Sequence, residues 1–128
     1  MENVVNFEIA KLLKEKGFDE GTLEIYPLVD FWEYKEGELS YFFEEGLDEA
    51  FAKESNFYCF APTIAEVVMW LYEKHGIWIF AEYGDDVLLF GFNICTIKTN
   101  TVEMVKFKFK SPTEAYEAAI KYCLEKII

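Results

Sequence analysis

The second half of the chain carries the pattern that most restricts its fold, two helix starts that enclose three strand-like segments. Thr63 precedes Glu66 by three residues, and Ser111 precedes Glu114 by the same spacing. In such a capping box the hydroxyl and the carboxylate each accept a hydrogen bond from an exposed amide at the start of a helix. A helix is therefore predicted to begin at each site, and Gly76 is expected to end the first of them.

Between the two predicted helices lie three segments rich in β-branched and aromatic residues, at about 77–83, 87–98 and 102–110. The connections between them are short, which forces neighbouring strands to run antiparallel. The third segment alternates apolar residues with lysines, as expected for a strand with one buried face. These features predict an α+β fold in which the helices pack on one face of an antiparallel sheet.

The first half is less regular. Expected elements are a helix at 6–16, a hairpin of 31–34 and 39–43 around Gly37, and a short helix at 47–53. Residues 19–30 alternate like a strand, but Pro27 has no amide hydrogen, which predicts an edge strand or an irregular connection. The predicted order is α-β-β-(α)-α-β-β-β-α, and the sequence leaves open whether residues 19–54 extend the main sheet.

Length and composition favour a single cytoplasmic domain over residues 1–128. A chain of 128 residues with 52% hydrophobic residues has enough apolar material for one core. No apolar run approaches the roughly 18 residues of a membrane span, and the N-terminus lacks the basic and apolar regions of a secretion signal. The three cysteines are odd in number and lie in apolar contexts, which is typical of reduced thiols.

The net charge of −12 is concentrated in one segment, because residues 19–54 hold twelve acidic residues and two lysines. All 12 basic residues are lysines. Arginine is the residue that binds phosphate and guanine through two parallel hydrogen bonds, so nucleic-acid binding is disfavoured. The alternative explanation of the acidity is solubility alone.

Aromatic residues lie within the same acidic segment, among 24 rings in the whole chain. Most are expected in the core, but exposed rings surrounded by carboxylates would suit a protein partner with an apolar centre and a basic rim. The leading hypothesis is a non-enzymatic interaction protein that binds a partner, or a second copy of itself, through residues 19–54. Its candidate site residues are Trp32, Tyr34, Glu36, Glu38, Tyr41, Glu44 and Glu45.

Two other functions are weighed against this hypothesis. A small hydrolase would use two of the clustered carboxylates, with His75 as a proton carrier, although a histidine in the last turn of a helix is also explained by the helix dipole. A weak nucleic-acid binder would use Lys106, Lys108 and Lys110 on the third strand, although lysines on an edge strand also prevent aggregation. No cofactor and no metal site are expected, because the cysteines form no C-x-x-C pair and the acids lack the spacing of a calcium loop.

Three segments carry a resemblance to known proteins: FEIAKLLKEKGF at 7–18, APTIAEVVMWLYEKHGI at 61–77 and SPTEAYEAAIKYCL at 111–124. They resemble a group of small uncharacterised proteins of gut Bacteroidetes that occur in phage and mobile-element contexts. The resemblance implies a cytoplasmic protein of such an origin and carries over no functional residue. For a protein of that kind, one version of the leading hypothesis is an inhibitor or DNA mimic whose carboxylates imitate phosphates.

The order of helices and strands also resembles the double-stranded RNA-binding domain. That family has a lysine cluster at the start of its last helix, where this chain has Ser-Pro-Thr-Glu at 111–114. A glutamate at this position would repel the phosphates that the family binds. RNA binding is therefore not expected.

Overall fold

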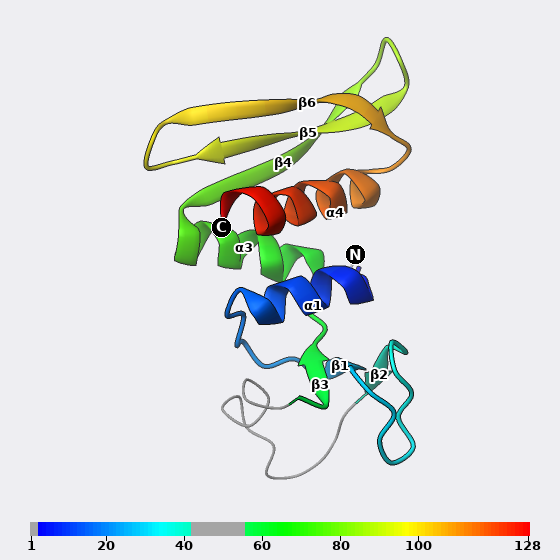
Figure 1. The fold of residues 1–128 in the computed structure, drawn as a ribbon. Helices are drawn as coiled ribbons and strands as arrows, with labels where there is room; N and C mark the ends of the chain where they lie inside the picture. The colour runs from blue at the N-terminus through cyan, green and yellow to red at the C-terminus, as the bar shows by residue number, and fades with distance from the viewer. Residues whose placement is uncertain (1–2, 42–55) are drawn as a thin grey trace. The chain divides into compact units, whose positions relative to one another are not determined.

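The computed structural model describes residues 3–41 and 56–128, with the side chains of 104–106 excepted (Figure 1). By their internal contacts the described residues form two compact units. The C-terminal unit consists of Asn3 with Thr63–Ile128, and the N-terminal unit consists of Val4–Pro62. In the parts that are described, no helix has the length and apolar character needed to cross a membrane. The single domain expected from the chain length stays a prediction.

The C-terminal unit confirms the predicted α+β arrangement. Its elements are α3 (Ile64–His75), β4 (Ile77–Gly84), β5 (Leu89–Thr96), β6 (Thr101–Phe109), α4 (Pro112–Tyr122) and the π-helix η1 (Cys123–Ile127). The strands form an antiparallel sheet in the order β4-β5-β6. Both α-helices lie on the same side of this sheet, with α4 packed on β4 and β5 (Figure 1).

Local hydrogen bonds explain where these two helices begin. The Thr63 hydroxyl accepts a hydrogen bond from the Glu66 amide at 3.2 Å, and the Glu66 carboxylate accepts one from the Thr63 amide at 3.0 Å, so the predicted capping box is present. Ser111 caps α4 by accepting from the Glu114 amide at 3.1 Å. The Glu114 carboxylate, however, accepts from the Lys110 amide rather than from that of Ser111. In this second cap the carboxylate therefore binds the amide of the residue before the N-cap, one position earlier than in a standard capping box.

The core of the C-terminal unit lies between the helices and the inner face of the sheet. Its buried side chains are Val67, Trp70, Leu71, Ile77, Ile79, Phe92, Ile94, Ala115, Ala119, Ile120, Cys123 and Leu124. The spacing of apolar residues predicts that the last helix buries a stripe of Tyr116, Ala119, Ile120, Cys123 and Ile127. Three of these are buried, but Tyr116 and Ile127 are only partly buried, and Leu124 is fully buried instead. The chain changes to π-helical winding at Cys123, which widens the last turn.

The N-terminal unit has a small antiparallel sheet of its own. Its elements are α1 (Phe7–Glu15), β1 (Glu24–Pro27), β2 (Ser40–Tyr41) and β3 (Tyr58–Phe60), and the strand order is β2-β1-β3. Asn6 caps α1 by accepting a hydrogen bond from the Ile9 amide at 2.9 Å. The described elements follow the expected order of one helix and then two strands, with β3 as one further strand. The described strands of 19–54 thus form a sheet separate from β4-β5-β6.

The expectation for Pro27 was wrong, because β1 is the central strand of its sheet. Strand β2 pairs only with Glu24 and Ile25, so on that side Pro27 lies beyond the ladder. Its carbonyl oxygen accepts a hydrogen bond from the Gly37 amide at 2.9 Å. A proline at the end of a central strand therefore costs no ladder bond on the β2 side.

The hairpin expected between 31–34 and 39–43 was also wrong. Phe31 and Tyr34 pair with each other, and Ser40–Tyr41 pairs with Glu24–Ile25 of β1. Trp32 has φ 49°, a left-handed conformation that reverses the chain within four residues, so 31–34 makes a closed turn instead of a strand. The helix expected at 47–53 lies outside the described residues.

Candidate functional site

The segment 28–41 joins β1 to β2 and contains the described members of the predicted binding site. Phe31 anchors it, since its ring is half-buried and lies 6.4 Å from the ring of Tyr58 and 5.6 Å from that of Phe57. Tyr58 belongs to the buried cluster around Ile25. The backbone amides of Phe31 and Tyr34 donate to each other's carbonyl oxygens at 3.2 and 2.9 Å, which closes the turn.

Trp32 lies at the tip of this closed turn and is 70% exposed. Beside it the chain forms a hollow of about 650 Å³, lined by Trp32, Glu33, Tyr34, Ser40 and Tyr41. The Tyr34 hydroxyl donates to the Tyr41 carbonyl oxygen at 3.4 Å, which links the turn to β2. The structure thus brings together three of the predicted site residues, Trp32, Tyr34 and Tyr41.

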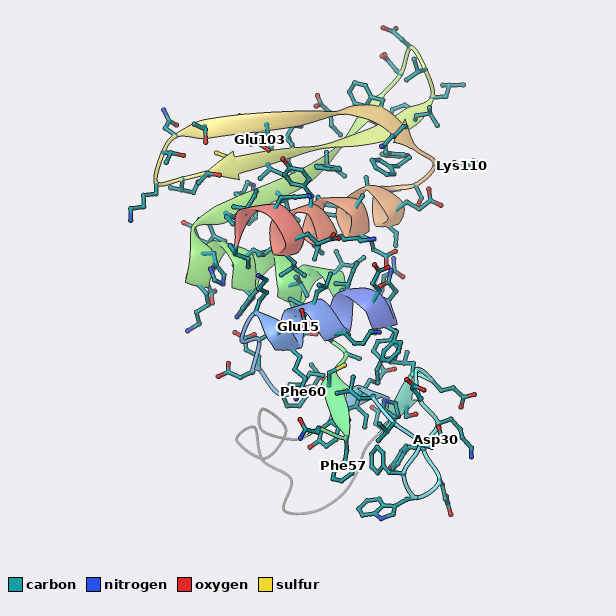
Figure 2. The ribbon with its side chains drawn as sticks, in the orientation of Figure 1. Glu15, Asp30, Phe57, Phe60, Glu103 and Lys110 are labelled. Carbon is teal, nitrogen blue, oxygen red and sulfur yellow. The ribbon has the colours of Figure 1, made fainter. Side chains whose placement is uncertain are left out.

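Acidic residues are concentrated in the segment that forms this hollow, which we call the aromatic hollow, and one of them, Glu33, lines it. Segment 28–41 contains four carboxylates, those of Asp30, Glu33, Glu36 and Glu38, and one lysine. The Asp30 carboxylate, labelled in Figure 2, accepts a hydrogen bond from the Glu36 amide at 2.8 Å and so shapes the chain after the turn. Glu36 and Glu38 are exposed, whereas Glu44 and Glu45 lie outside the described residues.

This arrangement is suited to an organic cation. Aromatic faces attract ammonium and guanidinium groups through their quadrupoles, and Trp is the strongest of them. Glu33 adds a full negative charge to the same lining. Sequence reasoning identified the three rings but missed Glu33 and Ser40. Glu33 could have been found from its position beside Trp32, whereas nothing in the sequence distinguishes Ser40.

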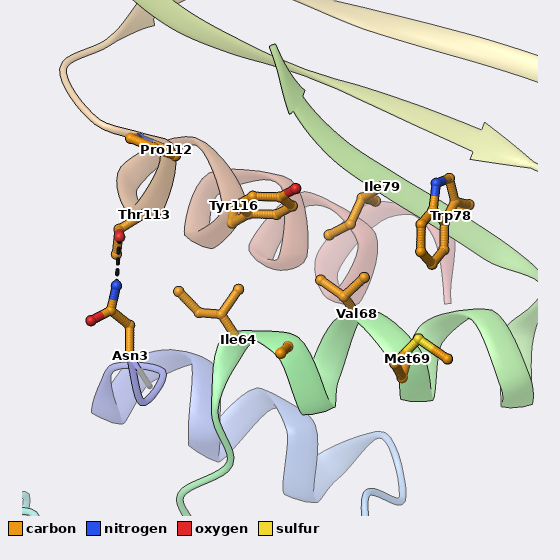
Figure 3. Close-up of a pocket in the computed structure, with 10 residues that line it drawn as sticks. Asn3, Ile64, Val68, Met69, Trp78, Ile79, Pro112, Thr113 and Tyr116 are labelled. Carbon is orange, nitrogen blue, oxygen red and sulfur yellow. Dashed lines mark hydrogen bonds between the residues drawn. The ribbon is translucent and has the colours of Figure 1, made fainter. Parts of the chain in front are cut away.

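A second cavity lies wholly within the C-terminal unit (Figure 3). It has a volume of about 380 Å³ and is bounded by the first half of α3, the start of β4 and the start of α4. Its lining consists of Asn3, Ile64, Ala65, Val68, Met69, Trp78, Ile79, Pro112, Thr113 and Tyr116. At one end the Asn3 side-chain amide donates to the Thr113 hydroxyl at 2.7 Å. Sequence reasoning missed this cavity, because Ile64 and Val68 have the same spacing as core residues of a helix.

The two cavities do not contain the groups expected of a hydrolase. His75 is exposed in the last turn of α3, where its ring lies edge-on to Trp70 at 4.8 Å, and it lines neither cavity. Glu33 is the one carboxylate among the two linings. Among the described residues, no group of three His, Cys, Asp or Glu side chains is arranged to hold a metal ion. The hydrolase function stays a prediction, and neither cavity has a geometry that supports it.

The lysine row is described only in part. Lys108 and Lys110 are exposed, and the Lys108 ammonium lies 5.5 Å from the centre of the Phe109 ring. The Lys106 side chain is outside the described residues. The alternation of buried and exposed positions expected for this strand is present at its described end, where Phe107 and Phe109 are half-buried. Nucleic-acid binding by this row stays a prediction.

No protein-family model, curated protein or solved structure matches this chain. The geometry of the two cavities therefore carries the functional argument.

Proposed function

We propose that this protein binds a partner protein through the aromatic hollow and the four carboxylates of segment 28–41, which we call its acidic rim. The observation that carries the proposal is the 70% exposure of Trp32 at the tip of a turn that is closed by its own backbone. Tyr41, on the facing strand, is 50% exposed. Large aromatic side chains that remain exposed are enriched at binding surfaces, where their burial supplies most of the affinity.

The acidic rim indicates the chemistry of the partner. A lysine or arginine side chain would fit the aromatic hollow, with its cation against the rings and near the Glu33 carboxylate. Further basic groups on the partner would face Glu36 and Glu38, which are exposed. Because the chain has a net charge of −12, a basic partner would also be attracted over longer distances. The partner is thus proposed to carry a basic surface around an apolar centre.

Substitution of exposed aromatic residues tests this proposal. Immobilised protein would capture partners from a cell lysate, with quantitative mass spectrometry as the readout. Trp32→Ala and Tyr41→Ala are expected to lower the affinity for a captured partner by about thirtyfold, the loss of about 2 kcal/mol that is typical of a central contact. The matched control is Tyr83→Ala, because Tyr83 is 49% exposed but lies in the other unit.

Charge reversal tests the rim separately. The double variant Glu36→Lys, Glu38→Lys should lose the same partners as Trp32→Ala, and the loss should be larger at low ionic strength. If the captured proteins are the same for wild type, Trp32→Ala, Tyr41→Ala and the charge-reversed variant, the proposal is wrong.

A narrower form of the proposal concerns the identity of the partner. The resemblance to small proteins of gut Bacteroidetes in phage contexts supports a cytoplasmic inhibitor whose rim carboxylates occupy the phosphate-binding surface of a DNA-binding protein. Duplex DNA should then displace the captured partner, and the charge-reversed variant should not inhibit DNA binding by that partner. If DNA and this protein bind the partner together, the narrower form fails and the broader one stands.

A further inference from the structure

We propose that the cavity bounded by α3, β4 and α4 binds an uncharged, mainly apolar small molecule that carries one hydrogen-bonding group. This inference is independent of the aromatic hollow, since every residue of the cavity belongs to the C-terminal unit. We call it the apolar cavity.

The size of the apolar cavity points to a small molecule. Its volume of about 380 Å³ falls within the roughly 300–1,000 Å³ of known small-molecule sites. At about 30 Å³ for each water molecule, it would hold about a dozen waters. A ligand with one fused ring system or with two linked rings would displace these waters.

The lining of the cavity determines the chemistry of that ligand. Figure 3 shows Ile64 and Val68 of α3 below Tyr116 of α4 and Ile79 of β4, with Met69 of α3 below Trp78 of β4. None of its ten lining residues is charged, so nothing in the lining would compensate a charged ligand for its lost hydration. Water against such walls is poorly hydrogen-bonded, and its release favours an apolar guest.

One end of the cavity is polar and would orient the ligand. There the Thr113 hydroxyl accepts a hydrogen bond from the Asn3 amide at 2.7 Å (Figure 3). A hydroxyl that accepts one bond can still donate its own hydrogen and accept a second bond. A ligand with a single donor or acceptor at one end would therefore bind with that group against Thr113.

A fluorescent probe tests whether the cavity is a binding site. N-phenyl-1-naphthylamine is uncharged, has one N–H group and emits strongly in apolar surroundings. Wild-type protein is expected to increase its emission saturably. Val68→Phe should abolish this increase, because the new ring occupies the cavity. Val102→Phe, which adds the same ring at a 60% exposed position on β6 outside the cavity, should leave it unchanged.

The polar end is tested with two competitors of the same shape, indole and indene, of which only indole has an N–H group. Thr113→Val removes the hydroxyl and keeps the size of the side chain. It should weaken the binding of indole by about fivefold, the usual net contribution of one hydrogen bond, and leave the binding of indene unchanged. Equal effects on both competitors would show that the hydroxyl does not orient the ligand.

The outcomes separate this inference from the proposed function. Trp32→Ala should bind the probe normally, and Val68→Phe should capture protein partners normally. If Val68→Phe fails to fold, as judged by circular dichroism, Ala65→Phe replaces it, because Ala65 is exposed on α3 and also lines the cavity. Saturable binding that is the same in wild type and in the cavity-filling variants would overturn the inference, and so would the absence of saturable binding to wild type.

Discussion

At the scale of single residues, burial makes two of the cysteine thiols unreactive at neutral pH. Burial raises the pKa of Cys59 to about 11, although Lys14 and Lys11 partly oppose the shift. Burial also raises the pKa of Cys123 to about 12, and the nearby Glu103 carboxylate adds to the effect. Because the thiolate is the reactive form, both side chains act as small apolar groups at neutral pH.

Alkylation by iodoacetamide at pH 8 should distinguish the three cysteines. A thiol with a pKa of about 11 is about one thousandth ionised at that pH, so Cys59 and Cys123 should remain unmodified in the folded protein. Cys95 is partly exposed and should react first. Peptide mapping by mass spectrometry gives the sites, and all three should react in urea. Fast labelling of Cys123 without denaturant would mean that the last helix opens readily.

At the scale of elements, the close packing at the end of β4 depends on Gly84 having no side chain. A Cβ atom added to Gly84 would lie 2.8 Å from Cγ of the Phe107 ring of β6, closer than carbon atoms pack. The ring therefore rests against the strand backbone. Only glycine permits this contact without a shift of Phe107.

Gly84→Ala is accordingly expected to destabilise the protein by about 1–3 kcal/mol, the usual cost of forcing an extra carbon into a packed site. Phe107→Ala removes the three ring carbons that a Cβ atom at position 84 would meet, so alanine at position 84 should cost less in the double variant. Urea denaturation of the four proteins measures this coupling. Additive effects of the two substitutions would contradict a direct contact.

Elements that depend on neighbours in sequence could be predicted, and those that depend on distant pairing could not. The caps at Thr63 and Ser111 and the left-handed Gly76 are local, so the helices and the β4-β5-β6 sheet follow from the sequence. The pairing of β1 with both β2 and β3 joins residues far apart in the chain. Pro27 also led to the wrong prediction that this stretch is an edge strand or an irregular connection.

The candidate site shows the same division between local and distant information. The acidic and aromatic composition of segment 28–41 indicated a binding surface. The opposite environments of Phe31 and Trp32, however, result from the left-handed backbone at Trp32. Non-glycine residues rarely adopt that conformation, so sequence alone does not indicate it.

At the scale of the whole molecule, the net charge of −12 should oppose folding and favour a basic partner. Salt screens both effects. Raising sodium chloride from low to high concentration should therefore increase the melting temperature while weakening partner binding. The variant Glu36→Gln, Glu38→Gln should show a smaller increase, measured by differential scanning calorimetry. A melting temperature that does not respond to salt would mean that the carboxylates do not repel one another appreciably.

The closed turn at 31–34 also affects how tightly a partner could be held. Its two reciprocal backbone bonds exist before any partner arrives, and Trp32 already points into solvent. A loop that is ordered in advance loses little conformational entropy when it docks. A short macrocycle copying these four residues would keep much of that advantage, whereas the same sequence as a linear peptide would lose it.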